Sequence, residues 1–104
     1  MTRYDIGVLD DFTTGTARQL KVAGRILVAV RIEQDVYILD DRCSHEDFSL
    51  AEGEVNVGTR EIECARHGAM FRLSDGEPTS FPATRPVAHY VVFEDAGRLE
   101  VEVP

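Results

Sequence analysis

Apolar and polar residues alternate with a period of two along most of the chain, which predicts β-strands rather than helices. In Arg98–Val103 the apolar residues occupy one face only, whereas in Arg25–Ile32 both faces are largely apolar. A strand that is apolar on both faces belongs inside a sandwich or a barrel. We therefore predict an all-β fold, an antiparallel sandwich or partly open barrel. About nine short strands are expected, at Tyr4–Val8, Ala17–Val22, Arg25–Ile32, Val36–Leu39, Glu54–Val57, Arg60–Glu63, Ala69–Leu73, Val87–Phe93 and Arg98–Val103.

Short turns are expected between several of these strands. Ala23-Gly24 and Gly58-Thr59 are typical of tight hairpin turns, and Gly7 suggests a bulge in the first strand. The chain has 104 residues, which is enough for one domain with a modest core and too few for two. We expect a single domain over residues 1–104.

The charge of the chain limits the classes of partner that it can bind. Eleven basic residues against nineteen acidic ones give a net charge of −8, which would repel nucleic acids and anionic membranes. No apolar run approaches the roughly eighteen residues of a membrane span. The first residues also lack the apolar segment of a signal peptide, so a cytoplasmic protein is expected.

The candidate chemistry lies in two short segments, Cys43-Ser44-His45 and Cys64-Ala65-Arg66-His67. They contain the only two cysteines and two of the three histidines. Two thiolates and two imidazoles suit tetrahedral zinc or an iron–sulfur cluster. Because each segment supplies one ligand of each type, the pattern favours two adjacent irons, with both cysteines on one and both histidines on the other. A zinc-binding interaction module remains the alternative.

These segments and their surroundings resemble the signature of Rieske ferredoxins. Cys-x-His is followed, after an eighteen-residue interval, by Cys-x-x-His-Gly. The resemblance is to the ferredoxins of aromatic-ring dioxygenases, and also to small Rieske proteins associated with iron–sulfur cluster assembly. It covers residues 36–104, and its motifs are residues 45–53 for the first cluster loop, 68–71 with Gly76 for the second, and 82–87 for a proline loop against the cluster.

The resemblance implies a site, a cofactor and a fold. One [2Fe-2S] cluster would be bound by Cys43, His45, Cys64 and His67, with the cysteines on a buried iron and the histidines at the exposed tip. A small subdomain formed by two loops, about residues 40–86, would hold it beside a Rieske-like sandwich. In high-potential relatives, serine and tyrosine hydroxyls stand at the positions of Ala69 and Phe71.

No catalytic group is recognisable outside this site, so the chain is expected to be an electron carrier and not an enzyme. Rieske oxygenases use a mononuclear iron in a separate large domain, which 104 residues cannot contain. The resemblance implies a monomer that docks transiently with a flavin-dependent reductase and a terminal non-haem iron oxygenase. An accessory role in iron–sulfur cluster assembly is the alternative function.

The residues around the first loop suggest how docking occurs. Six acids face two bases there, which predicts electrostatic steering of a basic partner; the acids are Asp40, Asp41, Glu46, Asp47, Glu52 and Glu54, and the bases are Arg42 and Arg66. The alternative is apolar docking through Phe48 or Phe81, although these residues and Phe71 could equally fill the core. The third histidine, His89, is expected to be an ordinary strand residue.

Overall fold

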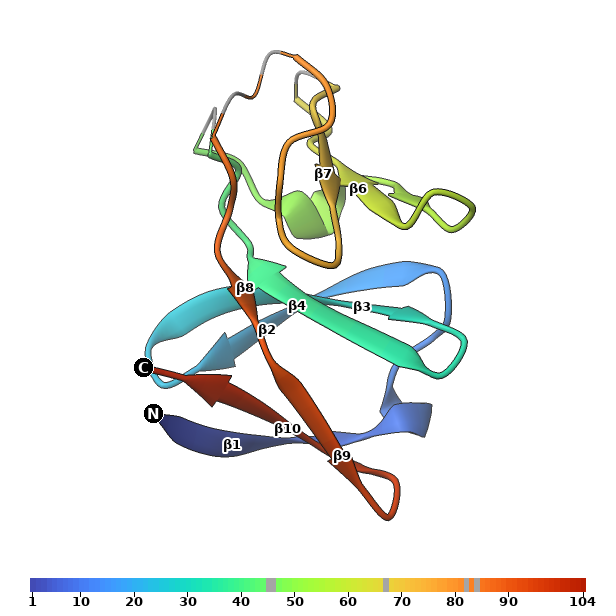
Figure 1. Cartoon of the computed structure of the whole chain (residues 1–104), viewed down its shortest axis with the longest axis vertical. Helices are drawn as coiled ribbons and strands as arrows, with labels where there is room; N and C mark the ends of the chain where they lie inside the picture. Colours follow the sequence, from blue (N-terminus) through green and yellow to red (C-terminus); the bar gives the residue numbers. More distant parts are fainter. Residues whose placement is uncertain (45–46, 67, 82, 84) are drawn as a thin grey trace.

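The chain folds into three antiparallel sheets, which confirms the predicted all-β class (Figure 1). The structure is a computed structural model that describes residues 1–44, 47–66, 68–81, 83 and 85–104. An outer sheet has the order β1 (Thr2–Val8), β10 (Arg98–Val103), β9 (Val92–Asp95). A middle sheet has the order β2 (Thr16–Val22), β3 (Arg25–Ile32), β4 (Asp35–Asp40), β8 (His89–Tyr90). The third has the order β5 (Val55–Asn56), β6 (Glu61–Glu63), β7 (Met70–Arg72).

The middle sheet is covered on both faces, as the double apolar pattern of β3 predicts. Leu27 and Ala29 of β3 lie in one core with residues of the outer sheet, including Val101. Val28 and Val30, on the opposite face, lie in a second core with residues of the third sheet. The alternation of β3 therefore places the third sheet and its loops on the face of the middle sheet away from β1, β9 and β10 (Figure 1).

Eight of the predicted strands are confirmed within two residues at each end, and Arg25–Ile32 and Arg98–Val103 are confirmed without change. The turn at Ala23-Gly24 joins β2 to β3 with both residues at positive φ, which is the backbone of a type I′ hairpin. The pairing register of β1 with β10 shifts between Asp5 and Gly7, which confirms the bulge. Two short 3₁₀ helices interrupt the strands, η1 (Leu9–Asp11) and η2 (Leu50–Glu52). Over the described residues, no helix is long and apolar enough to cross a membrane.

The single strand predicted over Val87–Phe93 is wrong. Its residues divide between β8, which pairs with β4 of the middle sheet, and β9, which pairs with β10 of the outer sheet. The chain crosses from one sheet to the other at the exposed Val91. Because residues 90–93 are an unbroken apolar run, and no glycine or proline marks the crossing, the sequence carries no local sign of the change.

Candidate metal centre

Both cysteines are buried in the same apolar core. Cys43 follows β4 and Cys64 follows β6, and their exposed fractions are 3% and 0%. They share the core between the middle and third sheets with Leu50, Ala69 and Phe71. The structure therefore brings together the two predicted thiolate ligands, which are twenty-one positions apart. The predicted ligands His45 and His67 lie outside the described residues, and the described residues alone contain no group of three or more metal-ligating side chains.

The two ligand loops are closed in the same way. The amide of Cys43 donates to the carbonyl of Phe48 at 3.0 Å, and the amide of Cys64 donates to the carbonyl of Ala69 at 2.7 Å. Each cysteine is thus tied at the base of its loop to the residue five positions later. In the second loop the amide of Gly68 also donates to the carbonyl of Cys64, with φ at +75°, a conformation that favours glycine.

A buried carboxylate, Asp41, holds the first loop to the sandwich. Its exposed fraction is 4%, and it accepts from the Gln19 side chain at 2.7 Å, the Ser49 hydroxyl at 2.6 Å and the Ala51 amide at 2.9 Å. The carbonyl of Asp41 also accepts from the amide of Leu50. A buried carboxylate with three donors fixes the geometry of the chain around it. This role is not visible in the sequence, where Asp41 is one of six acids around the first loop.

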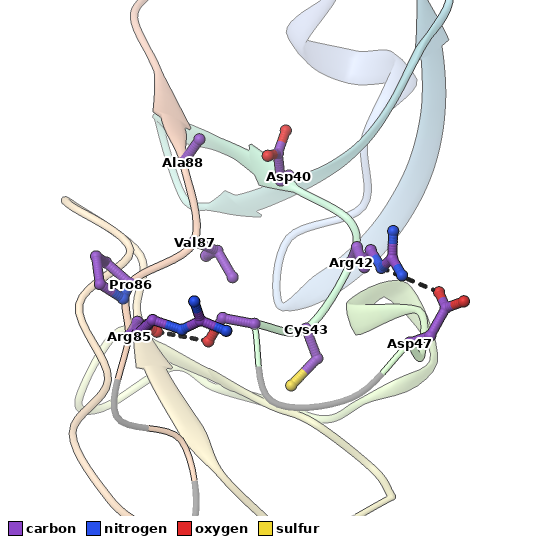
Figure 2. Close-up of a pocket in the computed structure, with 9 residues that line it drawn as sticks. Asp40, Arg42, Cys43, Asp47, Arg85, Pro86, Val87 and Ala88 are labelled. Carbon is purple, nitrogen blue, oxygen red and sulfur yellow. Dashed lines mark hydrogen bonds and ion pairs between the residues drawn. The ribbon is translucent and has the colours of Figure 1, made fainter.

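A third segment packs against the first loop. Ala83 and Val87 are buried in the core that contains both cysteines, and the hydroxyl of Ser44 donates to the carbonyl of Arg85. Ser44, Cys43 and Arg85 line a cavity of about 460 Å³, and Figure 2 shows Cys43 and Arg85 on facing segments. The described part of residues 82–87 therefore lies against the loop of Cys43, as the resemblance implies, while Pro82 and Thr84 lie outside the described residues.

The described residues fit an iron–sulfur cluster at this site. Two sulfur donors lie in an apolar core, and each loop carries a histidine at the second or third position after its cysteine. Soft thiolate donors on two such loops suit an iron–sulfur cluster. The comparison with protein families agrees with this chemistry, because residues 2–91 match the Rieske [2Fe-2S] domain. The chain belongs to the Rieske family.

Several similar proteins are ferredoxins of dioxygenase systems. The chain is 34% identical over 101 residues to the anthranilate 1,2-dioxygenase ferredoxin subunit of Burkholderia cepacia, covering 96% of this chain and 91% of the relative. The solved ferredoxin of carbazole 1,9a-dioxygenase from Nocardioides aromaticivorans IC177 is 31% identical, with a TM-score of 0.93 and 97% of each chain covered. A chain from a complex of oxygenase and ferredoxin in carbazole 1,9a-dioxygenase is 30% identical, with a TM-score of 0.87, covering 95% of this chain and 91% of that one.

These comparisons confirm the predicted fold and cofactor. The protein is an electron-carrying Rieske ferredoxin of the dioxygenase type, and its domain binds one [2Fe-2S] cluster. Zinc, the alternative metal in the sequence analysis, does not agree with this family. The structural match over nearly the whole chain also extends the resemblance to the first third, where the sequence shows only generic strands.

The aromatic residues near the Rieske site have three different environments. Phe71 is fully buried beside the cysteines, and Phe48 is partly buried against the same core. Phe81 is 83% exposed. The side chains of Phe71 and Ala69 have no donor, so neither side chain can give a hydrogen bond to a cluster sulfur. Core packing is thus confirmed for Phe71, whereas Phe81 is left as a surface residue.

The acids predicted to steer a basic partner have different environments in the structure. Asp41 is buried with its three donors, and Asp47 forms an ion pair with Arg42 at 3.2 Å (Figure 2). Asp40 accepts from the Tyr90 hydroxyl at 2.6 Å. Burial, and then the hydrogen bond to Asp40, raise the pKa of Tyr90, so the hydroxyl keeps its proton. Glu46 lies outside the described residues. Glu52 and Glu54 are exposed. Of the described acids counted along the sequence, burial therefore removes only Asp41 from the surface, and the pair of Asp47 with Arg42 leaves the balance unchanged because Arg42 was counted as a base.

Proposed function

We propose that Cys43 and Cys64 bind one iron of the cluster and that His45 and His67 bind the other. The support is the burial of both cysteines in one core and the matching amide hydrogen bonds at the bases of their loops. Each hydrogen bond encloses four residues, 44–47 in the first loop and 65–68 in the second, and each of these segments contains one histidine. The bound cluster supplies one-electron chemistry, and imidazoles in place of two thiolates raise its potential above that of all-cysteine clusters.

The function proposed for the whole chain is to pass single electrons from a flavin-dependent reductase to a terminal non-haem iron oxygenase. The observation that carries this proposal is the similarity over more than 90% of both chains to dioxygenase ferredoxins, one of them in a complex with its oxygenase. Residues 1–104 would act as one domain, with residues 40–86 as the cluster-binding part. The protein would work as a cytoplasmic monomer and dock only transiently, through a small interface.

Metal analysis of the purified protein tests the proposed site. We expect a red-brown protein with two irons and two sulfides per chain and, after reduction, the electron paramagnetic resonance spectrum of a cluster with mixed histidine and cysteine ligands. The physical reason is that the two cysteines alone cannot complete the coordination of two irons. A colourless protein with one tightly bound zinc would contradict the proposal.

The reduction potential tests the roles of Ala69 and Phe71. Hydrogen bonds to the cluster sulfurs stabilise the added electron, and neither of these buried side chains can donate one. We expect a potential in the low part of the Rieske range of about −150 to +300 mV. Ala69→Ser combined with Phe71→Tyr should raise it in protein-film voltammetry or a redox titration.

A matched control uses Phe93→Tyr, which adds a hydroxyl in β9 of the outer sheet, away from the core that contains the cysteines. This variant should leave the potential unchanged. A wild-type potential above roughly +150 mV, in the upper half of the Rieske range, would show that the site has donors other than these two positions.

A further inference from the structure

Most arginines of the chain are neutralised by an acid. The ion pairs are Arg3–Glu102, Arg31–Asp10, Arg42–Asp47, Arg60–Asp35, Arg72–Asp75 and Arg98–Asp5. Four exposed arginines have no carboxylate within 4.0 Å among the described residues. Arg18 and Arg25 belong to β2 and β3 of the middle sheet, whereas Arg66 and Arg85 lie outside the strands. Paired charges largely cancel at a distance, so unpaired ones dominate the local field.

Arg66 and Arg85 lie next to the cluster loops. Arg66 is in the second loop, two residues after Cys64. The carbonyl of Arg85 accepts from Ser44, the residue after Cys43, and its side chain lines the cavity beside that cysteine (Figure 2). The loops from which they come meet at the end of the molecule away from β1, β9 and β10 (Figure 1).

An exposed aromatic residue lies in the same region. Phe81 precedes Ala83, which is buried in the core with both cysteines, yet Phe81 itself is 83% exposed. Arginine and aromatic residues are enriched in protein interfaces. We call the exposed residues Arg66, Phe81 and Arg85 the tip surface. Among the acids of the first loop, Asp47 is paired with Arg42, and Glu52 belongs to η2, which packs against β2 and β3 of the middle sheet. Glu46 lies outside the described residues.

We propose that the tip surface docks against an acidic face of the redox protein that receives the electron, with carboxylates of that partner binding Arg66 and Arg85. The inference rests on the proposed function and reverses the charge expected of the partner from the sequence. Although the whole chain carries a net charge of −8, encounter is governed by charges within a Debye length of the docking site, about 8 Å at physiological ionic strength. Guanidinium groups are well suited to bind carboxylates in a bidentate way.

Small redox reagents of opposite charge test the sign of this local field without a known partner. The reduced protein is mixed in a stopped-flow instrument with ferricyanide, an anion that takes one electron and becomes ferrocyanide, at a series of salt concentrations. The same series is run with tris(phenanthroline)cobalt(III), a cation that also takes one electron. With a basic tip surface, oxidation by ferricyanide should slow about threefold or more as salt rises. Oxidation by the cobalt complex should not slow.

Single variants locate the charge. Arg66→Glu and Arg85→Glu should each weaken the salt dependence with ferricyanide, and the double variant should reverse it. Lys21→Glu, an exposed position in β2 of the middle sheet, makes the same change in net charge and should leave the dependence as in the wild type.

The outcomes separate the two proposals. A wild-type rate with ferricyanide that rises with salt contradicts a basic tip surface, even if the variants prove unstable. An effect of Lys21→Glu as large as that of Arg66→Glu or Arg85→Glu contradicts it as well. Absence of the cluster spectrum in the reduced wild-type protein instead overturns the proposed function, and it is seen before any rate is measured.

Discussion

Replacing either cysteine by serine is expected to abolish the cluster. Cys43 and Cys64 are the only cysteines in the chain, and both are buried at the bases of their loops. No other thiol can move in to replace the lost ligand. A buried serine hydroxyl is a much poorer ligand for iron than a thiolate. We expect less than about a tenth of the wild-type iron and sulfide after purification, with loss of the visible absorption, because ligand loss removes the site outright.

His45→Ala and His67→Ala are expected to have the same result. The control is His89→Ala, because His89 is exposed in β8 and lies outside the core of the two cysteines. That variant should keep two irons per chain and the wild-type spectrum. Far-ultraviolet circular dichroism separates loss of the cluster from loss of the fold, since the core of the outer and middle sheets contains neither cysteine. A Cys43→Ser protein that retains two irons would refute the ligand assignment.

The general architecture could be predicted because it depends on patterns that are local in sequence. The double apolar face of Arg25–Ile32 predicted a strand covered on both sides, and the structure places its alternate residues in two different cores. The hairpin at Ala23-Gly24 could be predicted from a local feature, a glycine between two apolar strands, because glycine adopts positive φ without strain. The crossing at Val91 could not be predicted, since the choice between two partner strands depends on the position of the sheets and not on the crossing residues.

The same contrast applies to the site. The ligand types were recognisable because few residues bind iron, and their spacing is short. The role of Asp41 was not, because its three donors come from positions as far away as Gln19 and become neighbours only in the folded chain. Charge was also misjudged at this position, since Asp41 was counted as a surface acid and the structure buries it.

The role of Gly53 cannot be seen in the sequence, because it depends on a contact with a residue ten positions away. This contact is the basis of a second prediction. Gly53 follows η2 with ordinary backbone angles, φ −87° and ψ 171°, so its conformation is open to any residue. Its importance comes from a close approach. A Cβ at this position would overlap the carbonyl oxygen of Glu63 and lie 2.7 Å from the carbonyl carbon. Glu63 directly precedes Cys64, so a side chain at Gly53 pushes on the peptide that carries a cluster ligand.

Gly53→Ala is therefore expected to destabilise the protein by about 3 kcal/mol or more, at the upper end of the cost of overpacking. For a domain of this size that corresponds to a fall in Tm of at least about 12 °C. The displaced Glu63 carbonyl should also disturb the base of the second loop, which is closed by the Cys64 amide. We expect lower cluster occupancy as well as a lower Tm, measured by iron content and by thermal unfolding followed by circular dichroism.

Gly58→Ala is the matched control, since the same atoms are added in the turn between β5 and β6. Gly58 does not have a positive φ, and the nearest atom to its added Cβ is the side-chain oxygen of Asn56 at 3.5 Å, an ordinary contact. Replacing such a glycine restricts the unfolded chain, which stabilises a protein by about 0.4–1 kcal/mol. The two substitutions should thus change Tm in opposite directions. Equal Tm values for Gly53→Ala and the wild type would show that the backbones of the two ligand loops do not pack together as closely as this contact requires.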